Sequence, residues 1–370
     1  MFLVVTRSFP PEVGGMQVLM GGLSEGLLEH GPVKIFAYKS PNSDEYDKKK
    51  LLNIERIKSI KLFRKYRKAN IVNDFISKNS NIRAVFFDHW KSLELINSAF
   101  LKKTKVFCLT HAKEINHATE SSLNKRLLKS LNKSDYIVAN SNFTKKLCIK
   151  VGINKDKINI INPGIYKPQE LDKIYLDEAK NYFCDNSNNN AFPKILTVAR
   201  LEKRKNHDKI LMTIKNLKTK YPQIKYISVG DGEEKNKLIK LIDELKLNDN
   251  VIFLSNVNEK LKLSLFASAD LFLMPSVLDK KSVEGFGISF MEAASYGVGS
   301  IGGKDGGASD AILHNKTGLI CDGNDLGSIY DSVTNFLSNN KSIEFGNAAK
   351  KFSEGFYWNK IVKKYLNLIN

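Results

Sequence analysis

The chain has 370 residues, 42% of them hydrophobic, and this length exceeds what one core usually supports, so we expect two domains. No apolar run approaches the ~20 residues that cross a bilayer, and the first residues lack the pattern of a signal peptide, so we expect a soluble, cytoplasmic chain. The formal charge of +19 favours an anionic partner such as a membrane surface, a lipid phosphate or nucleic acid.

The first half opens with the strand, loop and helix that build a parallel sheet. An apolar strand at residues 2–6 leads through a Pro/Gly loop at 9–15 into a helix at about 16–29, and a strand at 33–38 follows. Further buried strands are predicted from short apolar runs at residues 84–87, 105–109, 136–139 and 158–161. The pattern predicts an N-terminal, Rossmann-like domain over residues 1–167.

The second half repeats this order without a detectable sequence repeat. A strand at residues 195–199 leads through a polar loop into a helix at 207–218, and a strand at 226–229 follows. Further strands are predicted at residues 251–253 and 271–274. A polar stretch at residues 186–190 is interpreted as a loop ahead of this second sheet.

The second domain is expected over residues 168–350. Residues 351–370 carry aromatic and aliphatic side chains at helical spacing. They predict a C-terminal helix that packs back on the N-terminal domain.

Two glutamates, Glu284 and Glu292, lie eight positions apart across a glycine-rich segment. Gly285 and Gly287 let the backbone approach a ligand closely, and the free N–H groups of the next helix attract an anion such as a diphosphate. We expect Glu284 just ahead of this helix and Glu292 about two turns into it, so that both contact one elongated ligand. The alternative is one glutamate favoured by the helix dipole and one solvated glutamate.

A basic run from Arg200 to Lys205 follows the first strand of the second half. The carboxyl ends of strands in a doubly wound fold face the ligand crevice, so Arg200 and Lys205 are expected to neutralise a departing diphosphate. Lys203 and Arg204 are expected to point to solvent. An exposed basic turn is the alternative interpretation of the whole run.

These segments together resemble the family 4 (group 1) retaining glycosyltransferases, whose fold is called GT-B, over nearly the whole chain. Family members typically carry a Gly-Gly loop after the first strand, similar to Gly14-Gly15, and a histidine in the N-terminal domain, similar to His111. An Asn-x-Gly turn at the domain boundary is similar to Asn162-Pro163-Gly164. The resemblance implies an α/β fold of two Rossmann-like, doubly wound parallel-sheet domains that face an interdomain cleft.

The resemblance also implies a role for each matching residue. Arg200 and Lys205 would hold the donor diphosphate, Glu292 the ribose hydroxyls and Glu284 the transferred sugar. His111 would contact the donor sugar near the reacting carbon. Further contacts to the donor would come from the glycine loop and the start of the helix, through Gly14, Gly15, Gly285, Phe286, Gly287 and Ile288.

Three features depart from the family's pattern. Asn206 stands where many relatives have glycine, and Asp310 stands where a glutamate often follows a glycine pair. Residues 297–300 lack a common proline. None of these changes removes a charge that the chemistry needs, but Asp310 has a shorter reach and is left without a role.

Neither a metal nor another cofactor is expected. No Asp-x-Asp motif follows a strand of the first half, and no His or Cys cluster has ligand spacing, so protein cations must neutralise the diphosphate. The four cysteines, Cys108, Cys148, Cys184 and Cys321, are scattered and are interpreted as packing residues in a reducing cytosol. The resemblance implies retention of anomeric configuration. Retention could result from a double displacement or from a front-face reaction.

The positive charge is concentrated in the first half. Residues 1–168 carry 30 Lys and Arg against 14 Asp and Glu, a net charge of +16 that leaves +3 for the remaining residues. Between Lys48 and Lys68, ten basic residues and one acid, Glu55, are interleaved with apolar residues. This stretch could lie on anionic lipid, or it could be a strand and a solvated loop. A lysine-rich genome is the alternative explanation of the overall charge.

The sequence therefore predicts a hexosyltransferase that resembles phosphatidylinositol-type mannosyltransferases. GDP-mannose is the first donor considered and a UDP-hexose the next, with a glycan, lipid-linked or phosphorylated acceptor in cell-envelope polysaccharide or glycolipid synthesis. A sugar-nucleotide epimerase of the same fold is the alternative. A nucleic-acid-binding protein is disfavoured because it leaves Glu284 and Glu292 unexplained, and a dehydrogenase because Gly14-Gly15 is not a G-x-G-x-x-G fingerprint.

Overall fold

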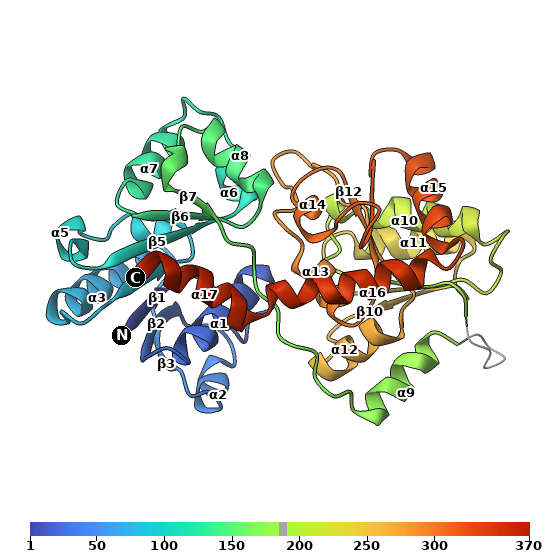
Figure 1. Cartoon of the computed structure of the whole chain (residues 1–370), viewed down its shortest axis with the longest axis horizontal. Coiled ribbons are helices and arrows are strands. Elements are labelled where there is room, and N and C mark those ends of the chain that lie inside the picture. Colours follow the sequence, from blue (N-terminus) through green and yellow to red (C-terminus); the bar gives the residue numbers. More distant parts are fainter. Residues whose placement is uncertain (185–190) are drawn as a thin grey trace. The chain divides into compact units, whose positions relative to one another are not determined.

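The computed structural model describes residues 1–184 and 191–370, so the polar stretch at 186–190 lies outside the described residues. The chain divides into two compact units (Figure 1). Unit 1 comprises Met1–Tyr166 and Phe356–Asn370, and unit 2 comprises Lys167–Gly355. The boundary expected after residue 350 falls inside helix α16 (Lys341–Ser353), which packs on α13 (Ile288–Ser295) and therefore belongs to unit 2.

Unit 1 contains a seven-stranded, wholly parallel sheet of order β3-β2-β1-β4-β5-β6-β7. Its strands are β1 (Phe2–Val5), β2 (Val33–Tyr38), β3 (Asn53–Ile57), β4 (Ala84–Phe87), β5 (Lys105–Thr110), β6 (Tyr136–Ala139) and β7 (Ile158–Ile160). The strand order reverses between β1 and β4. At such a reversal, a doubly wound sheet opens a crevice at the carboxyl ends of its strands.

Helices cover both faces of this sheet because successive strand residues point to opposite sides. Leu3 and Val5 belong to one core with α3, α4, α7 and α8, whereas Phe2 and Val4 belong to a second core with α1 and α17. The helices of unit 1 are α1 (Gly15–Leu28), α2 (Ser43–Lys48), α3 (Arg64–Lys78), α4 (Trp90–Leu93), α5 (Ser98–Leu101), α6 (Ala112–Ile115), α7 (Ser122–Leu131), α8 (Asn142–Lys150) and α17 (Trp358–Ile369), with 3-10 turns η1 (Lys155–Lys157) and η3 (Glu354–Phe356) at its margins.

The last helix, α17, packs against α1 on the first sheet (Figure 1). Trp358, 6% exposed, fills a site between two glycines. A Cβ added to Gly22 would lie 2.1 Å from the Trp358 indole, and one added to Gly164 would lie 2.5 Å from it. The backbone N–H of Trp358 also donates to the carbonyl of Ile165 at 3.1 Å. The glycines therefore create the space that the indole fills.

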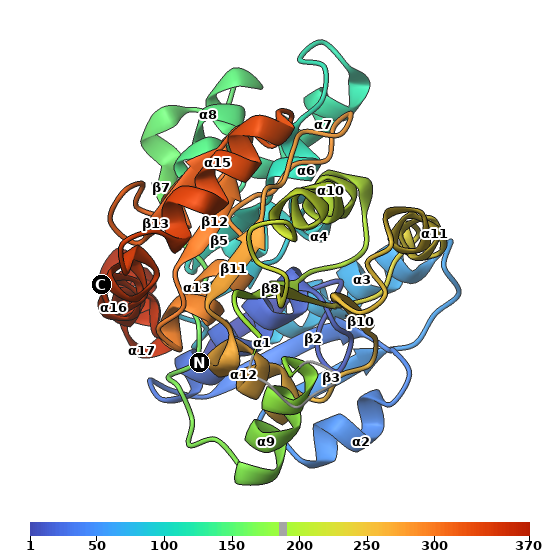
Figure 2. The same ribbon diagram turned by 90° about the vertical axis from the view of Figure 1, so that its right-hand side faces the viewer.

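Unit 2 contains a six-stranded parallel sheet of order β10-β9-β8-β11-β12-β13. Its strands are β8 (Lys194–Val198), β9 (Lys225–Val229), β10 (Val251–Leu254), β11 (Leu271–Met274), β12 (Ser300–Gly303) and β13 (Gly318–Cys321). Its other helices are α9 (Lys173–Tyr182), α10 (His207–Leu217), α11 (Lys235–Leu245), α12 (Glu259–Ser268), α14 (Ala308–Ala311) and α15 (Leu326–Leu337), with the 3-10 turn η2 (Lys203–Lys205). One face of the sheet packs against α10, α11 and α15, which Figure 2 shows in the foreground.

The two sheets confirm the predicted α/β architecture, and every predicted strand is present within two residues of its expected ends. Three strands were not predicted: β3, β12 and β13. β3 carries three polar residues in five on a sheet edge, and β12 ends in two glycines, which are depleted in strands. Their local sequences therefore lack the continuous apolar run of a buried strand.

Three of the four cysteines lie in the hydrophobic cores. Cys108 and Cys148 are buried in unit 1 and Cys321 in unit 2, whereas Cys184 is partly exposed. Burial raises the pKa of the Cys148 and Cys321 thiols to about 12. These two thiols are therefore protonated at neutral pH.

Candidate functional site

The basic run of unit 2 lies at the carboxyl end of β8. The chain leaves β8 at Val198, passes Arg200 and forms the short turn η2. β11 is the neighbour of β8, and its last residue, Met274, contacts Lys205 with an Sδ–Nζ distance of 3.2 Å. Because the strand order reverses between β8 and β11, this is the sheet edge at which doubly wound domains bind ligands.

Two cations hold the Glu284 carboxylate at this edge. Its Oε2 accepts hydrogen bonds from Lys205 Nζ and from Arg204 Nη1, the latter at 3.0 Å. All three side chains are largely buried. Burial alone would raise the pKa of Glu284, but Lys205 and Arg204 outweigh it and lower the pKa to about 2. The carboxylate is therefore charged at neutral pH, with its direction fixed by the two cations.

We expect Glu284 to stabilise the fold at neutral pH and to lose this contribution in acid. Its pKa is about 2 in the folded chain and about 4.3 when unfolded. The contribution is therefore complete above about pH 4.3 and is lost as the pH falls towards 2. Urea unfolding of the wild type and of Glu284→Gln would measure it, since the difference in unfolding free energy should shrink as the pH falls. A pH-independent difference would contradict the assignment.

The glycine-rich segment leads directly into α13. Gly287 precedes the helix with φ of 87°, a conformation that favours glycine, and a Cβ there would lie 2.5 Å from the Phe290 ring. Because α13 begins only at Ile288, Glu292 lies at the start of its second turn, and the prediction of about two turns is wrong. The Oε1 of Glu292 accepts a hydrogen bond from Lys262 Nζ of α12 at 2.9 Å. Each of the paired glutamates thus binds a lysine.

The structure contradicts the prediction that Arg204 points to solvent. Its side chain is 13% exposed and joins Glu202 to Glu284, with Nε–Oε2 and Nη1–Oε2 distances of 3.0 Å. Arg200, with a side chain 67% exposed, pairs with the other oxygen of Glu202 at 2.8 Å. The ion pairs therefore form one chain of alternating basic and acidic groups, from Arg200 through Glu202, Arg204 and Glu284 to Lys205. The alternation of charge at positions 200, 202 and 204 is the sequence signal that could have identified Glu202 and Arg204.

The glycine loop of unit 1 lies at the carboxyl edge of the first sheet. Gly14 directly precedes α1 and Gly15 is the first residue of that helix, which follows β1. The first N–H groups of an α-helix have no partner within the helix and attract anions. The role that the sequence resemblance implies for Gly14 and Gly15 stays a prediction.

His111 lies at the same edge, directly after β5. Its Nε2 donates to the carbonyl oxygen of Asp88 at 3.0 Å, and its backbone N–H donates to the Glu114 carboxyl group at 3.1 Å. The other oxygen of that carboxyl group contacts His89 Nε2. Burial raises the pKa of Glu114 to about 7 and lowers that of His89 to about 2. His89 is therefore neutral, the His111 ring is held by the Asp88 carbonyl group, and the His111 backbone is held by the buried Glu114 carboxyl group.

The structure brings some of the predicted residues together and leaves others apart. Lys205 and Glu284 are in contact, and Arg200 reaches them through Glu202 and Arg204. Glu292 lies on the helix that follows Glu284 and has a different partner. Within residues 1–184 and 191–370, no three His, Cys, Asp or Glu side chains lie close enough together to hold a metal ion.

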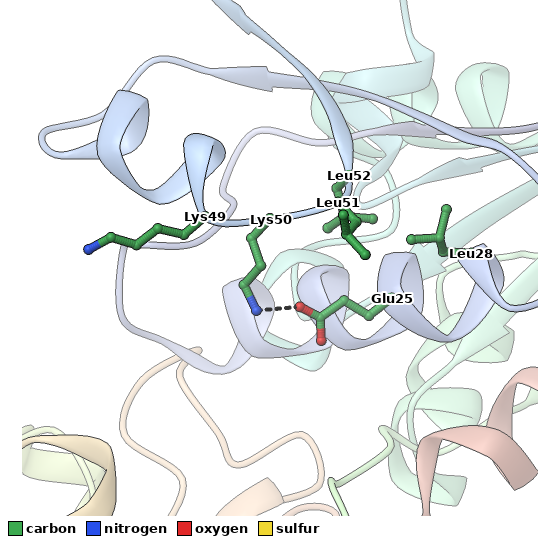
Figure 3. Close-up of a pocket in the computed structure, with 6 residues that line it drawn as sticks. All are labelled: Glu25, Leu28, Lys49, Lys50, Leu51 and Leu52. Atoms are coloured by element: carbon green, nitrogen blue, oxygen red, sulfur yellow. Dashed lines mark hydrogen bonds and ion pairs between the residues drawn. The ribbon is translucent and has the colours of Figure 1, made fainter.

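A separate pocket of about 300 Å³ lies in unit 1 (Figure 3). It is lined by Glu25 and Leu28 of α1 and by residues 49–52, and it contains none of the predicted site residues. Lys50 Nζ donates to Glu25 Oε1 at 2.7 Å across it. This ion pair joins α1 to the segment ahead of β3.

Two family models match the chain. The model described as Glycosyltransferase Family 4 matches residues 13–166, and the model described as Glycosyl transferases group 1 matches residues 179–352. The two matches fall in the two units that the structure separates.

Relatives and solved structures agree with these matches. A GDP-mannose-dependent alpha-(1-6)-phosphatidylinositol monomannoside mannosyltransferase from Mycolicibacterium smegmatis is 24% identical over 91% of this chain and 89% of its own length. The structure of HepE from Anabaena in complex with UDP has a TM-score of 0.79 at 16% identity, covering 100% of this chain and 99% of that one. A glycosyltransferase from Rickettsia africae has a TM-score of 0.80 at 19% identity, covering 100% and 97%. The structural similarity establishes the GT-B fold.

Proposed function

Because the chain belongs to the family 4 (group 1) glycosyltransferases, we propose that it moves a hexose from a nucleotide-diphosphate sugar to a glycan, lipid-linked or phosphorylated acceptor. The transfer proceeds with retention of configuration and without a metal ion. GDP-mannose is the first donor, supported by the relative from Mycolicibacterium smegmatis, and a UDP-hexose is the second. The observation that carries the proposal is the Glu284 carboxylate held by Arg204 and Lys205 at the ligand-binding edge of unit 2.

We assign roles in the proposed reaction to Arg200, Lys205 and Glu284 of this group, and to Glu292 on α13. Arg200 is exposed enough to leave Glu202 and contact a diphosphate, and Lys205 adds a second positive charge. Glu284 accepts hydrogen bonds from the hydroxyl groups of the transferred sugar, and Glu292 from those of the ribose. The departing diphosphate is thereby neutralised by protein side chains.

Nucleotide binding tests this function directly. We expect GDP or UDP, and the matching sugar nucleotide, to stabilise the chain by ~2.7 kcal/mol at a hundredfold excess over its dissociation constant. Thermal-shift measurements with and without EDTA would give the preferred base and the effect of metal removal, which we expect to be nil. If no nucleotide binds, the proposal fails, and if EDTA abolishes binding, metal independence fails. Proton NMR of the product's anomeric signal would test retention.

We further propose that the chain acts in the cytoplasm, peripherally at the inner face of a membrane, in cell-envelope polysaccharide or glycolipid synthesis. Among the described residues, no helix has the length and apolar character needed to cross a bilayer. The basic stretch from Lys48 to Lys68 is not one continuous element, because β3 divides it. Its second part, residues 58–67, is here called the basic-apolar segment, and it exposes large apolar side chains between lysines and arginines: Ile60, Leu62, Phe63 and Tyr66.

We expect the basic-apolar segment to bind anionic vesicles. Each basic residue near such a surface contributes about 1 kcal/mol, and the exposed apolar side chains add burial in the interface. Co-sedimentation with vesicles of phosphatidylcholine and phosphatidylglycerol should fall about tenfold or more for the double variant Leu62→Ser/Phe63→Ser. Ile174→Ser, which alters an exposed apolar residue of unit 2, is the matched control. Equal sedimentation of both variants would remove the membrane claim.

A further inference from the structure

Three cations gather at the carboxyl edge of the first sheet, where its strand order reverses. Arg7 follows β1, and Lys68 and Arg64 reach the same place from α3. Lys68 Nζ lies 4.4 Å and Arg64 Cζ 4.7 Å from the centroid of the Tyr38 ring, and Lys68 Nζ donates to the carbonyl oxygen of Thr6 at 3.1 Å. These three residues, with Asp88 beside them, are called the Arg7 cluster.

Asp88 does not use the hydrogen-bonding capacity of the Arg7 guanidinium. This wholly buried carboxylate accepts from Ser92 Oγ at 2.6 Å, from the Arg7 backbone N–H at 2.8 Å and from Thr6 Oγ1 at 3.2 Å. The Nε of Arg7 is 3.7 Å from Asp88 Oδ2 and, although buried, finds no hydrogen-bond partner among residues 1–184 and 191–370. A buried donor without a partner costs about 1–3 kcal/mol, so an acceptor that reaches the Nε–H of Arg7 would be stabilising.

The charge of this region is also unbalanced. The positive groups of Lys68 and Arg7 act on Asp88, and Arg64 acts on Lys68. Burial, together with Arg7 and Arg64, lowers the pKa of Lys68 to about 8. Glu114, a further acid on which Arg7 acts, has a pKa of about 7 and is only partly ionised at neutral pH. Neutral His89 adds no charge. The cluster therefore has an excess of positive charge for which a bound anion would compensate.

The cluster lies beside the residue that is expected to approach the reacting sugar. β1, β4 and β5 are consecutive neighbours in the sheet, and Arg7, Asp88 and His111 follow their carboxyl ends. The ring of His111 is bonded to the carbonyl of Asp88 itself. The side chain of Arg7 is 30% exposed, so a ligand at this edge can reach it.

We propose that the Arg7 cluster binds a phosphate group of the acceptor, with Arg7 as the direct ligand and Arg64 and Lys68 behind it. This inference rests on the proposed function and adds that the acceptor is an anion. A planar guanidinium is suited to bind phosphate oxygens in pairs, and the Nε–H of Arg7 has no hydrogen-bond partner among the described residues. The phosphate could belong to a lipid headgroup or to a soluble molecule, and the chemistry of recognition is the same for both.

The test titrates inorganic phosphate into the full chain at constant ionic strength, by calorimetry, with GDP or UDP present in saturating amounts. The bound nucleotide blocks the basic side chains of unit 2, so any phosphate that still binds reports on the site in unit 1. Arg7→Gln should weaken phosphate binding about tenfold or more. The matched control is Arg83→Gln, which removes the same charge at the amino end of β4, away from the carboxyl ends of the strands. This variant should bind phosphate like the wild type.

The outcomes separate this inference from the proposed function. Nucleotide binding without phosphate binding, or equal phosphate affinity in Arg7→Gln and the wild type, would overturn the Arg7 assignment alone. Absence of nucleotide binding would overturn the proposed function, and phosphate binding would then be measured without nucleotide. Co-sedimentation with phosphatidylcholine vesicles, with and without phosphatidylinositol, identifies the source of the phosphate group. Weaker sedimentation of Arg7→Gln on the phosphatidylinositol vesicles indicates a lipid phosphate, and unchanged sedimentation beside weakened binding of free phosphate indicates a soluble one.

Discussion

Replacing Arg200 or Lys205 by alanine is expected to lower turnover about a hundredfold or more. Removal of one preorganised donor to a developing anion costs roughly 3–4 kcal/mol, and both residues are proposed to neutralise the departing diphosphate. Single-turnover measurements with a saturating donor would separate this loss from weaker binding. Lys203→Ala is the matched control, because Lys203 belongs to the same turn and is exposed, and its turnover should stay near that of the wild type.

The two variants should differ in stability. Arg200 is exposed and its loss should change the free energy of unfolding by no more than about 0.5 kcal/mol. Lys205 is buried against Glu284, and its loss leaves that carboxylate with Arg204 alone, so this variant should unfold more easily. Turnover like that of the wild type in both variants would reject the assignment of the diphosphate site.

Trp358→Ala is expected to destabilise unit 1 by about 3–5 kcal/mol, the cost of emptying a buried aromatic site. The indole packs against Gly22 of α1 and Gly164 ahead of the unit boundary. Because glycine has no side chain, neither residue can fill the cavity that the loss of the indole would leave. Urea unfolding would measure the loss of stability, with far-UV circular dichroism as the signal because it does not depend on tryptophan fluorescence. Phe100→Ala, which removes a partly exposed aromatic ring of the same unit, should cost much less. A loss below about 1 kcal/mol would contradict the role of the indole.

Gly22→Ala tests the same contact from the other side. Alanine normally stabilises a helix interior by about 0.5–1 kcal/mol relative to glycine. Here its Cβ would lie 2.1 Å from the indole, so the sign should reverse. An increase in stability would show that α17 can shift to accept the methyl group.

The strands at the centre of both sheets could be predicted from the sequence because they are buried on both faces. β1, β4 and β11 are continuous apolar runs of four residues, and so is β10, which lies at a sheet edge. β3, at a sheet edge, has no such run and was missed. The buried strand β12 was missed as well, because it ends in two glycines, whereas β10 was predicted although it lies at an edge. The sequence therefore identified strands with a continuous apolar run and missed those without one.

The residues of the candidate site were predictable as positions but not as contacts. Arg200, Lys205 and Glu284 could be named because their types and spacing match a family's pattern. The partner of each could not, because the direction of a side chain on a turn depends on backbone angles that the sequence does not display. Arg204 is the example: one residue from Lys205, it turns inward to the same carboxylate oxygen. Likewise, nothing in the local sequence of Arg7 indicates Asp88, 81 positions away.

The return of α17 to the first sheet has a consequence for biosynthesis. Residues 356–370 complete unit 1, yet the ribosome makes them after all of unit 2. Until they emerge, the apolar face that Trp358, Ile361 and Tyr365 cover stays open to solvent on the nascent polypeptide. Unit 2, whose residues are contiguous, can finish folding first. The domain that is synthesised first can therefore complete its core only after unit 2 has been made.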